Sequence, residues 1–289
     1  MVYQSERQQR PRKAKSEMTG TPFIGLSPFQ WIAVIVASLT LLILADAFAG
    51  HYRSGFVFRS QYVPFISGGL LVITAISATV KPEAEWPNLA LRVAGWLAIV
   101  SGVIGFAFHH YYGIVKKPGG YKWLLHYLMY GAPQLAPLAL ALTGVLALVA
   151  ANGLANGVSF ASVSFRSALL ILVAMALSGA TLQATILHYR GAFNNPLMFA
   201  PLSAPVLAVI MCIGMVVVPN EVMFLVLAIL LWLTLLIGFV GLGMHLRGFS
   251  RQMGGLYVTV FNWLEGPPAF APAFFTGFAA VGLIAIYFL

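Results

Sequence analysis

The stretch His51–Ile73, HYRSGFVFRSQYVPFISGGLLVI, decides the fold because it occurs twice in the chain. It returns without a gap as His188–Ile210, HYRGAFNNPLMFAPLSAPVLAVI, shifted by 137 positions, and 8 of the 23 residues coincide. A second stretch, His110–Pro137, returns as His245–Pro272, shifted by 135, with 8 of 28 residues identical. Two gapless matches in the same order, with nearly the same offset, predict a tandem duplication.

The composition places both copies in a membrane. Of the 289 residues, 60% are apolar and only 8% are charged, whereas a soluble domain carries about 25% charged residues. The apolar runs are continuous and about 20 residues long, enough to cross roughly 30 Å of hydrocarbon. Helices satisfy their own backbone hydrogen bonds in lipid, and barrel strands would alternate in polarity. We therefore predict an all-α integral membrane protein.

The apolar runs predict eight transmembrane helices, four in each repeat. An even number of helices per repeat returns the chain to the same membrane face, so the repeats are predicted to be parallel. The predicted organisation is a disordered basic tail at 1–28, a first repeat at 29–151, a linker at 152–166 and a second repeat at 167–289. The predicted helices are 29–50, 62–80, 89–109, 135–151, 167–188, 201–219, 222–244 and 270–289.

The loops between the third and fourth helices of each repeat share one design. Each begins with a glycine pair, Gly119–Gly120 or Gly254–Gly255, continues with ten residues rich in Trp, Tyr and Phe, and closes with Gly-x-Pro-x-x-Ala-Pro. Aromatic segments of this length, bounded by glycine and proline, are typical of short helices that lie in the membrane interface. We predict one such interfacial helix in each loop.

The positive charge of the chain indicates lipid as its counterpart. Sixteen Lys and Arg residues against seven Asp and Glu give a net charge of +9. These charges lie in the tail and in short loops, so they favour topology signalling and contact with anionic headgroups over nucleic-acid binding. The basic tail predicts a multi-pass protein of the inner (plasma) membrane with a cytoplasmic N-terminus. The histidine loops would then face membrane or periplasmic protein partners.

All six histidines fall on one membrane face in this topology. Two repeat-related pairs, His51 with His188 and His110 with His245, lie where helices leave the lipid. Imidazole is a common ligand of metals and haem, so these four residues are candidate ligands of haem b or a metal ion, or contacts of a quinone. The alternative is that each histidine lies at headgroup level and hydrogen-bonds the last carbonyls of its helix.

Arginines accompany these histidines. Arg53, Arg190 and Arg247 each occupy the third position of a His-x-Arg sequence. A guanidinium group at a helix exit binds a haem propionate or an anionic substrate, or else a lipid phosphate. The single cysteine, Cys212, excludes an intrachain disulfide and most thiolate metal centres.

Asp46 is the only acidic residue within an apolar run, and at the offset of 137 it matches Gln183. An ionisable group within a membrane helix is a functional candidate by default, because inserting it costs a few kcal/mol. The pair therefore marks a candidate transport site. A single acid gives limited support, since proton-coupled transport usually relies on several.

Eight helices in two four-helix halves resemble, in architecture, the quinone-interacting membrane anchors of polysulfide-reductase type. The acidic motif of those anchors is not found here, so none of their quinone-binding residues is carried over. The chain also lacks a P-loop, a dinucleotide fingerprint, HExxH, Cys-x-x-Cys-His and a serine-nucleophile motif. A non-catalytic membrane subunit is therefore favoured over a stand-alone enzyme, and catalytic residues are not assigned.

Three functions remain open from the residues. The first is an anchoring or electron-transfer subunit of a membrane oxidoreductase, which uses the histidines. The second is a small-molecule transporter or channel with a polar site between the repeats. The third is a scaffold or assembly factor without a ligand. The first is preferred because it uses the most specific feature of the sequence.

Overall fold

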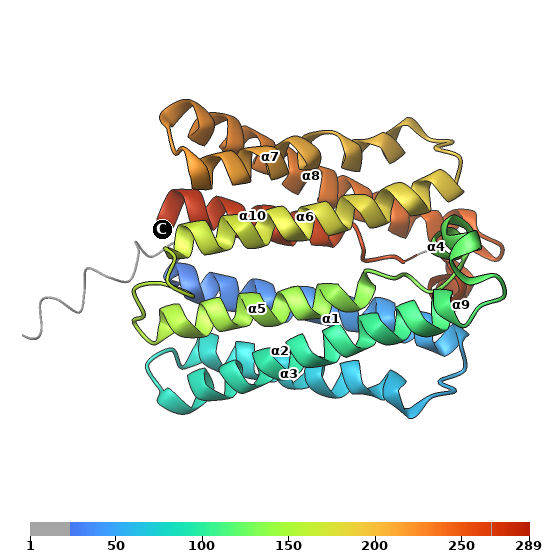
Figure 1. Ribbon diagram of the computed structural model, residues 1–289, viewed down its shortest axis with the longest axis horizontal. Helices are drawn as coiled ribbons and strands as arrows, with labels where there is room; N and C mark the ends of the chain where they lie inside the picture. The colour runs from blue at the N-terminus through green and yellow to red at the C-terminus, as the bar shows by residue number, and fades with distance from the viewer. Residues whose placement is uncertain (1–23, 267) are drawn as a thin grey trace, which may run out of the picture.

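The described part of the chain, residues 24–266 and 268–289 of a computed structural model, consists of helices and their connections without a strand (Figure 1). Seven helical segments are long and apolar enough to cross a membrane, which supports a multi-pass membrane protein. They contain α1 (Pro28–Arg53), α2 (Val63–Val80), α3 (Glu85–His110), α5 (Ala136–Leu154), α6 (Phe165–Arg190), α7 (Ala204–Val217) and α8 (Glu221–Arg251). Three of them are extended by η1 (Arg59–Tyr62) before α2, η2 (Tyr111–Val115) after α3 and η4 (Pro196–Leu202) before α7.

Seven of the eight predicted spans coincide with these long helices. The eighth, predicted at 270–289, falls on α10 (Ala273–Phe288), an apolar helix of 16 residues. At about 1.5 Å per residue its length is about 24 Å, less than the hydrocarbon core of a typical bilayer. The predicted tail, 1–28, lies almost entirely outside the described residues.

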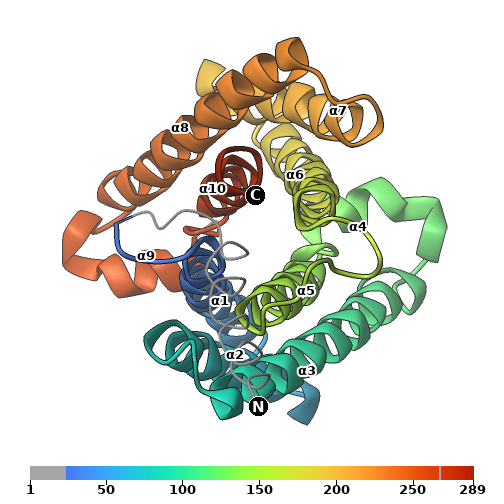
Figure 2. The same ribbon diagram turned by 90° about the vertical axis from the view of Figure 1, so that its left-hand side faces the viewer.

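The seven long helices and α10 form two groups. One group, here called the first region, covers residues 28–154 and contains α1, α2, α3 and α5; the second region covers residues 165–288 and contains α6, α7, α8 and α10. Seen along the helices, α1, α5, α6 and α10 lie at the centre and the other four lie outside them (Figure 2). The contacts agree, because α1 packs on α5 and α10, and α6 packs on the same two helices.

Local sequence explains where the helices begin. Ser27 and Gln30 form a capping box at the start of α1, in which each side chain accepts a hydrogen bond from the main-chain N–H of the other residue. Asn220 caps α8 by accepting from the main-chain N–H of Met223 at 2.9 Å. These caps satisfy N–H groups that a helix start otherwise leaves without partners.

Two glycines set how closely the third and fourth long helices of each region approach. A Cβ atom built on Gly102 of α3 would lie 2.6 Å from the carbonyl oxygen of Pro137. A Cβ atom built on Gly238 of α8 would lie 2.9 Å from the carbonyl oxygen of Pro272 and closer still to Thr276. The glycines therefore fix the starts of α5 and α10, which border the cavity described below.

Two short helices form in the segments for which interfacial helices were predicted. They are α4 (Leu124–Tyr130) and α9 (Thr259–Glu265), and both lie at the same end of the bundle (Figure 1). Each packs on the other region, because α4 contacts α6 and α9 contacts α1. Their depth relative to a membrane surface stays a prediction.

Candidate functional site

A cavity of about 2260 Å³ lies between the two regions. Its lining comes from the carboxyl-terminal parts of α1, α3, α6 and α8 and the amino-terminal parts of α2, α5 and α10. The cavity therefore occupies the half of the bundle that ends in α4 and α9. Most of the lining side chains are apolar, and a few polar and basic side chains project among them.

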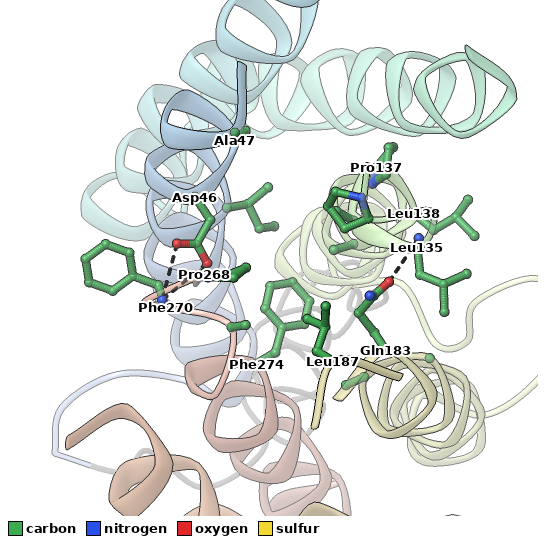
Figure 3. Close-up of a pocket in the computed structure, with 18 of the residues that line it drawn as sticks. Asp46, Ala47, Leu135, Pro137, Leu138, Gln183, Leu187, Pro268, Phe270 and Phe274 are labelled. Carbon is green, nitrogen blue, oxygen red and sulfur yellow. Dashed lines mark hydrogen bonds between the residues drawn. The ribbon is translucent and has the colours of Figure 1, made fainter. Parts of the chain in front are cut away.

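Asp46 lies in this cavity on α1 and joins the two regions (Figure 3). Its carboxylate accepts hydrogen bonds from the main-chain N–H groups of Ala269, at 3.1 Å, and Phe270, at 3.2 Å. These N–H groups precede α10, and a carboxylate is favoured at a helix start because the helix dipole is positive there. The Asp46 carboxylate, which the sequence placed within a membrane helix, is thus hydrogen-bonded to main-chain N–H groups of the second region.

Gln183 makes the corresponding contact from the opposite side of the cavity (Figure 3). Its side-chain oxygen accepts from the main-chain N–H of Leu135, just ahead of α5, at 3.4 Å. The structure therefore places both candidate transport residues on the cavity wall, each hydrogen-bonded to the other region. Gln183 carries no charge and has the longer hydrogen bond.

Arg53 and Arg190 also reach across between the regions. Arg53 donates to the carbonyl oxygen of Gly266 at 3.1 Å, and Arg190 donates to that of Met129 at 3.5 Å. The guanidinium carbon of Arg190 lies 5.0 Å from the ring centroid of Tyr130, within cation–π range. Both arginines line the cavity, as does Arg247 at the end of α8.

Four histidines line the cavity, and in the first region they are His51 and His109. The centroids of these two rings are 6.2 Å apart and their planes are 86° apart. Nδ1 of His109 lies 3.0 Å from the carbonyl oxygen of Pro133. A carbonyl oxygen only accepts, so Nδ1 of His109 carries the proton and Nε2 keeps its lone pair when the ring is neutral.

His51 is held in the opposite tautomer. The side-chain oxygen of Gln61 accepts from the main-chain N–H of Phe58 at 2.8 Å, which fixes the orientation of its amide. The amide nitrogen then donates to Nδ1 of His51 at 3.1 Å. A neutral His51 therefore carries its proton on Nε2 and acts as a donor there.

In the second region the cavity histidines are His188 and His245. Nδ1 of His188 lies 2.9 Å from the carbonyl oxygen of Met198, and Nδ1 of His245 lies 2.8 Å from that of Pro268. Both rings therefore donate through Nδ1 and keep the Nε2 lone pair. A main-chain acceptor on Nδ1 is the usual second contact of a metal-ligating histidine.

His110, the sequence candidate paired with His245, does not line the cavity. Its Nε2 lies 2.6 Å from the hydroxyl of Tyr121, in an exposed hydrogen bond. His109, and not His110, occupies the position that corresponds to His245, because His109 and His245 make the same contact with a proline carbonyl. His126 is exposed on α4 and stacks near Tyr130.

One extra residue in the first region explains this exchange. Gly102 and Gly238 match at an offset of 136, as do His109 and His245, whereas the glycine pairs after them match at 135. Directly after His110 the chain forms a π-helix, in which the N–H of Lys116 bonds to the carbonyl of Tyr111. A π-turn takes up a single inserted residue without breaking the helix. The gapless match of the sequence hid this shift.

No three His, Cys, Asp or Glu side chains within residues 24–266 and 268–289 are grouped so that they could hold a metal ion. Cys212 is buried away from the histidines in α7. Comparison of the chain with protein-family models, with curated proteins and with solved structures gave no match.

Proposed function

We propose that the chain is an electron-transfer subunit of a membrane oxidoreductase that binds haem b between paired imidazoles. The observation that carries the proposal is the set of four histidines on one cavity, three of which have Nδ1 held by a main-chain carbonyl. Their Nε2 lone pairs are free for an axial ligand bond. Haem supplies reversible one-electron transfer once it is bound.

Haem fits the arrangement better than a metal ion does. Structural zinc takes four protein ligands and catalytic zinc three, and no such group of side chains occurs in the part of the chain that the structure describes. A six-coordinate haem needs only two axial ligands. The cavity volume of about 2260 Å³ also exceeds the roughly 300–1,000 Å³ of a typical small-molecule pocket.

The hydrogen bonds favour His188 and His245 over His51 as individual ligands. Both rings keep the Nε2 lone pair, whereas His51 carries a proton there for as long as Gln61 donates to its Nδ1. The distance between His51 and His109 still suits ligation. Two imidazoles that share one metal, each at about 2 Å, have ring centroids roughly 6 Å apart when their nitrogens face each other, and the observed distance is 6.2 Å.

The proposal includes a two-unit architecture of eight membrane helices. Its support is that three contacts recur at matched positions of the two regions. A side-chain carboxylate or amide accepts a hydrogen bond from the main chain just before α10 or α5, and an arginine donates to a carbonyl oxygen of the other region. In addition, a glycine packs against the carbonyl oxygen of a proline. These contacts involve Asp46 and Gln183, Arg53 and Arg190, and Gly102 and Gly238. In this architecture α10 is the eighth helix.

The location of the protein is part of the same proposal. The basic residues of the tail favour a cytoplasmic N-terminus in the inner membrane. The cavity would then open toward the periplasm, where α4 and α9 would meet a partner protein that donates or accepts electrons.

The test is a reduced-minus-oxidised absorption spectrum with haem quantification on full-length protein, expressed with 5-aminolevulinate and purified in detergent. We expect a Soret band in the unsubstituted protein. We expect His245→Ala and His188→Ala to lose more haem than His51→Ala does. His110→Ala and His126→Ala are matched controls, since both remove an imidazole from the same end of the bundle without touching the cavity.

Protein that folds but binds no haem under these conditions would overturn the proposal. Loss of haem in the His110 control alone would also contradict it. If the colourless protein carried solute across proteoliposomes and Asp46→Asn or Gln183→Ala abolished that flux, a transporter would replace it. Without haem or flux, the scaffold hypothesis would stand.

A further inference from the structure

The cavity is at least as deep as one membrane leaflet. Its lining on α1 runs from Leu42 to Ser54, and its lining on α8 runs from Leu233 to Arg251. At about 1.5 Å per residue these stretches span about 18 and 27 Å, so both exceed half of a hydrocarbon core of about 30 Å. The deep walls are apolar, with side chains such as Ile43, Leu142 and Met175.

The open end of the cavity is basic. Two acidic residues line the cavity, Asp46 and Glu265, and the Asp46 carboxylate is already bonded to two main-chain N–H groups. The basic residues outnumber them and all lie toward the end that bears α4 and α9. They are Arg53, Lys117, Arg190, Arg247 and Arg251.

Arg53 and Arg190 retain donors for a ligand. A guanidinium group has five N–H donors in a planar fork that matches phosphate oxygens. Each of these arginines makes one hydrogen bond, to Gly266 or to Met129, which orients it and leaves the other N–H groups for an anion. The two arginines belong to the ends of α1 and α6, one in each region.

The cavity also reaches the lipid-facing surface. Its lining includes Ile66 of α2 and Val100 and Val103 of α3, whose side chains are 65%, 52% and 51% exposed. Such residues lie on the outside of the bundle and would contact acyl chains in a bilayer. A molecule of the surrounding leaflet therefore has a lateral path into the cavity.

We infer that the cavity binds an anionic phospholipid from the leaflet on the side of α4 and α9. The phosphate lies between Arg53 and Arg190, and the acyl chains extend along the apolar walls toward the bilayer centre. An apolar interior with a cationic mouth matches this molecule and not a hydrophilic solute. The inference does not depend on haem binding.

The first experiment is native mass spectrometry of the full-length protein, titrated in detergent with dioleoylphosphatidylglycerol or dioleoylphosphatidylcholine. We expect one phosphatidylglycerol to be retained and phosphatidylcholine to be retained at least tenfold less. The double variant Arg53→Gln/Arg190→Gln should reduce phosphatidylglycerol retention at least tenfold. Arg59→Gln is the control, because Arg59 lies at the same end of the bundle but does not line the cavity.

A second variant blocks the acyl-chain part of the cavity. Gly179 lines the cavity on α6, and a Cβ atom added there meets nothing within 4 Å, so Gly179→Leu should fill the cavity while the protein stays folded. Gly243→Leu is its control, since Gly243 has equally open surroundings but lies outside the lining. We expect only Gly179→Leu to lose the lipid, with unchanged thermal unfolding by circular dichroism.

Equal retention of the two phospholipids would overturn the inference. Unchanged phosphatidylglycerol binding in both the arginine double variant and Gly179→Leu would do so as well. Oleate is the third ligand tested, and binding of oleate in place of phosphatidylglycerol would assign the cavity to a free fatty acid and contradict a phospholipid.

Discussion

The two regions of the molecule make many of the same contacts, yet they differ in three places around the cavity. The first region has an aspartate on its first helix where the second has a glutamine. The first region holds one cavity histidine through a glutamine side chain, and the second uses main-chain carbonyls for both. The first region also contains a π-helix. The shared contacts join the two regions, and the differences all lie beside the cavity.

The π-helix teaches how an inserted residue is tolerated beside a site. It follows His109 and His110, so that His109 keeps its bond to Pro133 while the chain after it regains its register. In the second region α8 continues through His245 to Arg251 without such a turn. Because of the extra residue, the gapless sequence match pairs His110 with His245. The imidazole that lines the cavity is nevertheless that of His109.

The largest expected effect tests the contact that the two regions share. Gly102→Ala and Gly238→Ala each place a methyl group against the main chain of a neighbouring helix. Forcing that contact should destabilise the protein by about 2–3 kcal/mol in each case. The measurement is reversible unfolding in mixed micelles.

Gly243→Ala is the matched control for this comparison, because its Cβ atom would meet nothing within 4 Å. Alanine there should be neutral or stabilising by up to about 1 kcal/mol, owing to its helix propensity. If only one of the two packing glycines proved sensitive, the close contact would not be a shared requirement of the regions.

The next prediction compares how much Asp46 and Gln183 each contribute to the stability of the protein. Asp46→Ala removes an anionic acceptor from two main-chain N–H groups and should cost about 1–2 kcal/mol, since hydrogen bonds to charged groups are the stronger ones. Gln183→Ala removes one bond of 3.4 Å and should cost about 0.5 kcal/mol. Asp46→Asn keeps a hydrogen-bond acceptor, so its loss of stability should lie between those of Asp46→Ala and Gln183→Ala.

The same unfolding assay measures all three variants. Equal losses for the aspartate and the glutamine variants would mean that the charge contributes nothing to joining the regions. A gain in stability for Asp46→Asn would assign the carboxylate to function, because the protein would then be keeping a destabilising charge.

A smaller effect is expected from removing the inserted residue. Deleting Tyr112 should convert the π-helix into an α-helix, as in α8, at a cost of about 1 kcal/mol or less. Haem content should stay unchanged, because His109 lies before the deletion and keeps its contact with Pro133. The checks are haem quantification and backbone hydrogen exchange in residues 111–117. Loss of the fold would show that the π-helix is required by its own surroundings.

The membrane-spanning helices could be predicted because an apolar run of about 20 residues depends only on local composition. The span predicted at 270–289 was too long, because the helix begins only after Pro272 and α10 has 16 residues. The capping of α1 by Ser27 and Gln30 also depends only on local chemistry, but it was not predicted.

The site was less accessible to sequence reasoning. Asp46 and Gln183 were identified as polar residues at matched positions, but their partners at Phe270 and Leu135 depend on how the regions pack. His109 was missed because a gapless match assigns His110 to His245, and only the contact with Pro133 reveals the shift. A signal was present, since the offset fell from 137 to 135 along the chain.

The smallest expected effect concerns how the short helices attach to the opposite region. Arg190 lies over the ring of Tyr130 at 5.0 Å, whereas the residue matched to Tyr130 at the offset of 135 is Glu265, which has no ring. Tyr130→Leu should therefore weaken the attachment of α4 by about 0.5–1 kcal/mol, while Glu265→Leu should leave α9 nearly unchanged. Backbone hydrogen exchange of the two helices measures this directly, because local opening is what a lost docking contact promotes. Equal acceleration of exchange in both helices would mean that the arginine–carbonyl bonds alone hold them, and that the cation–π contact adds nothing to the difference between the regions.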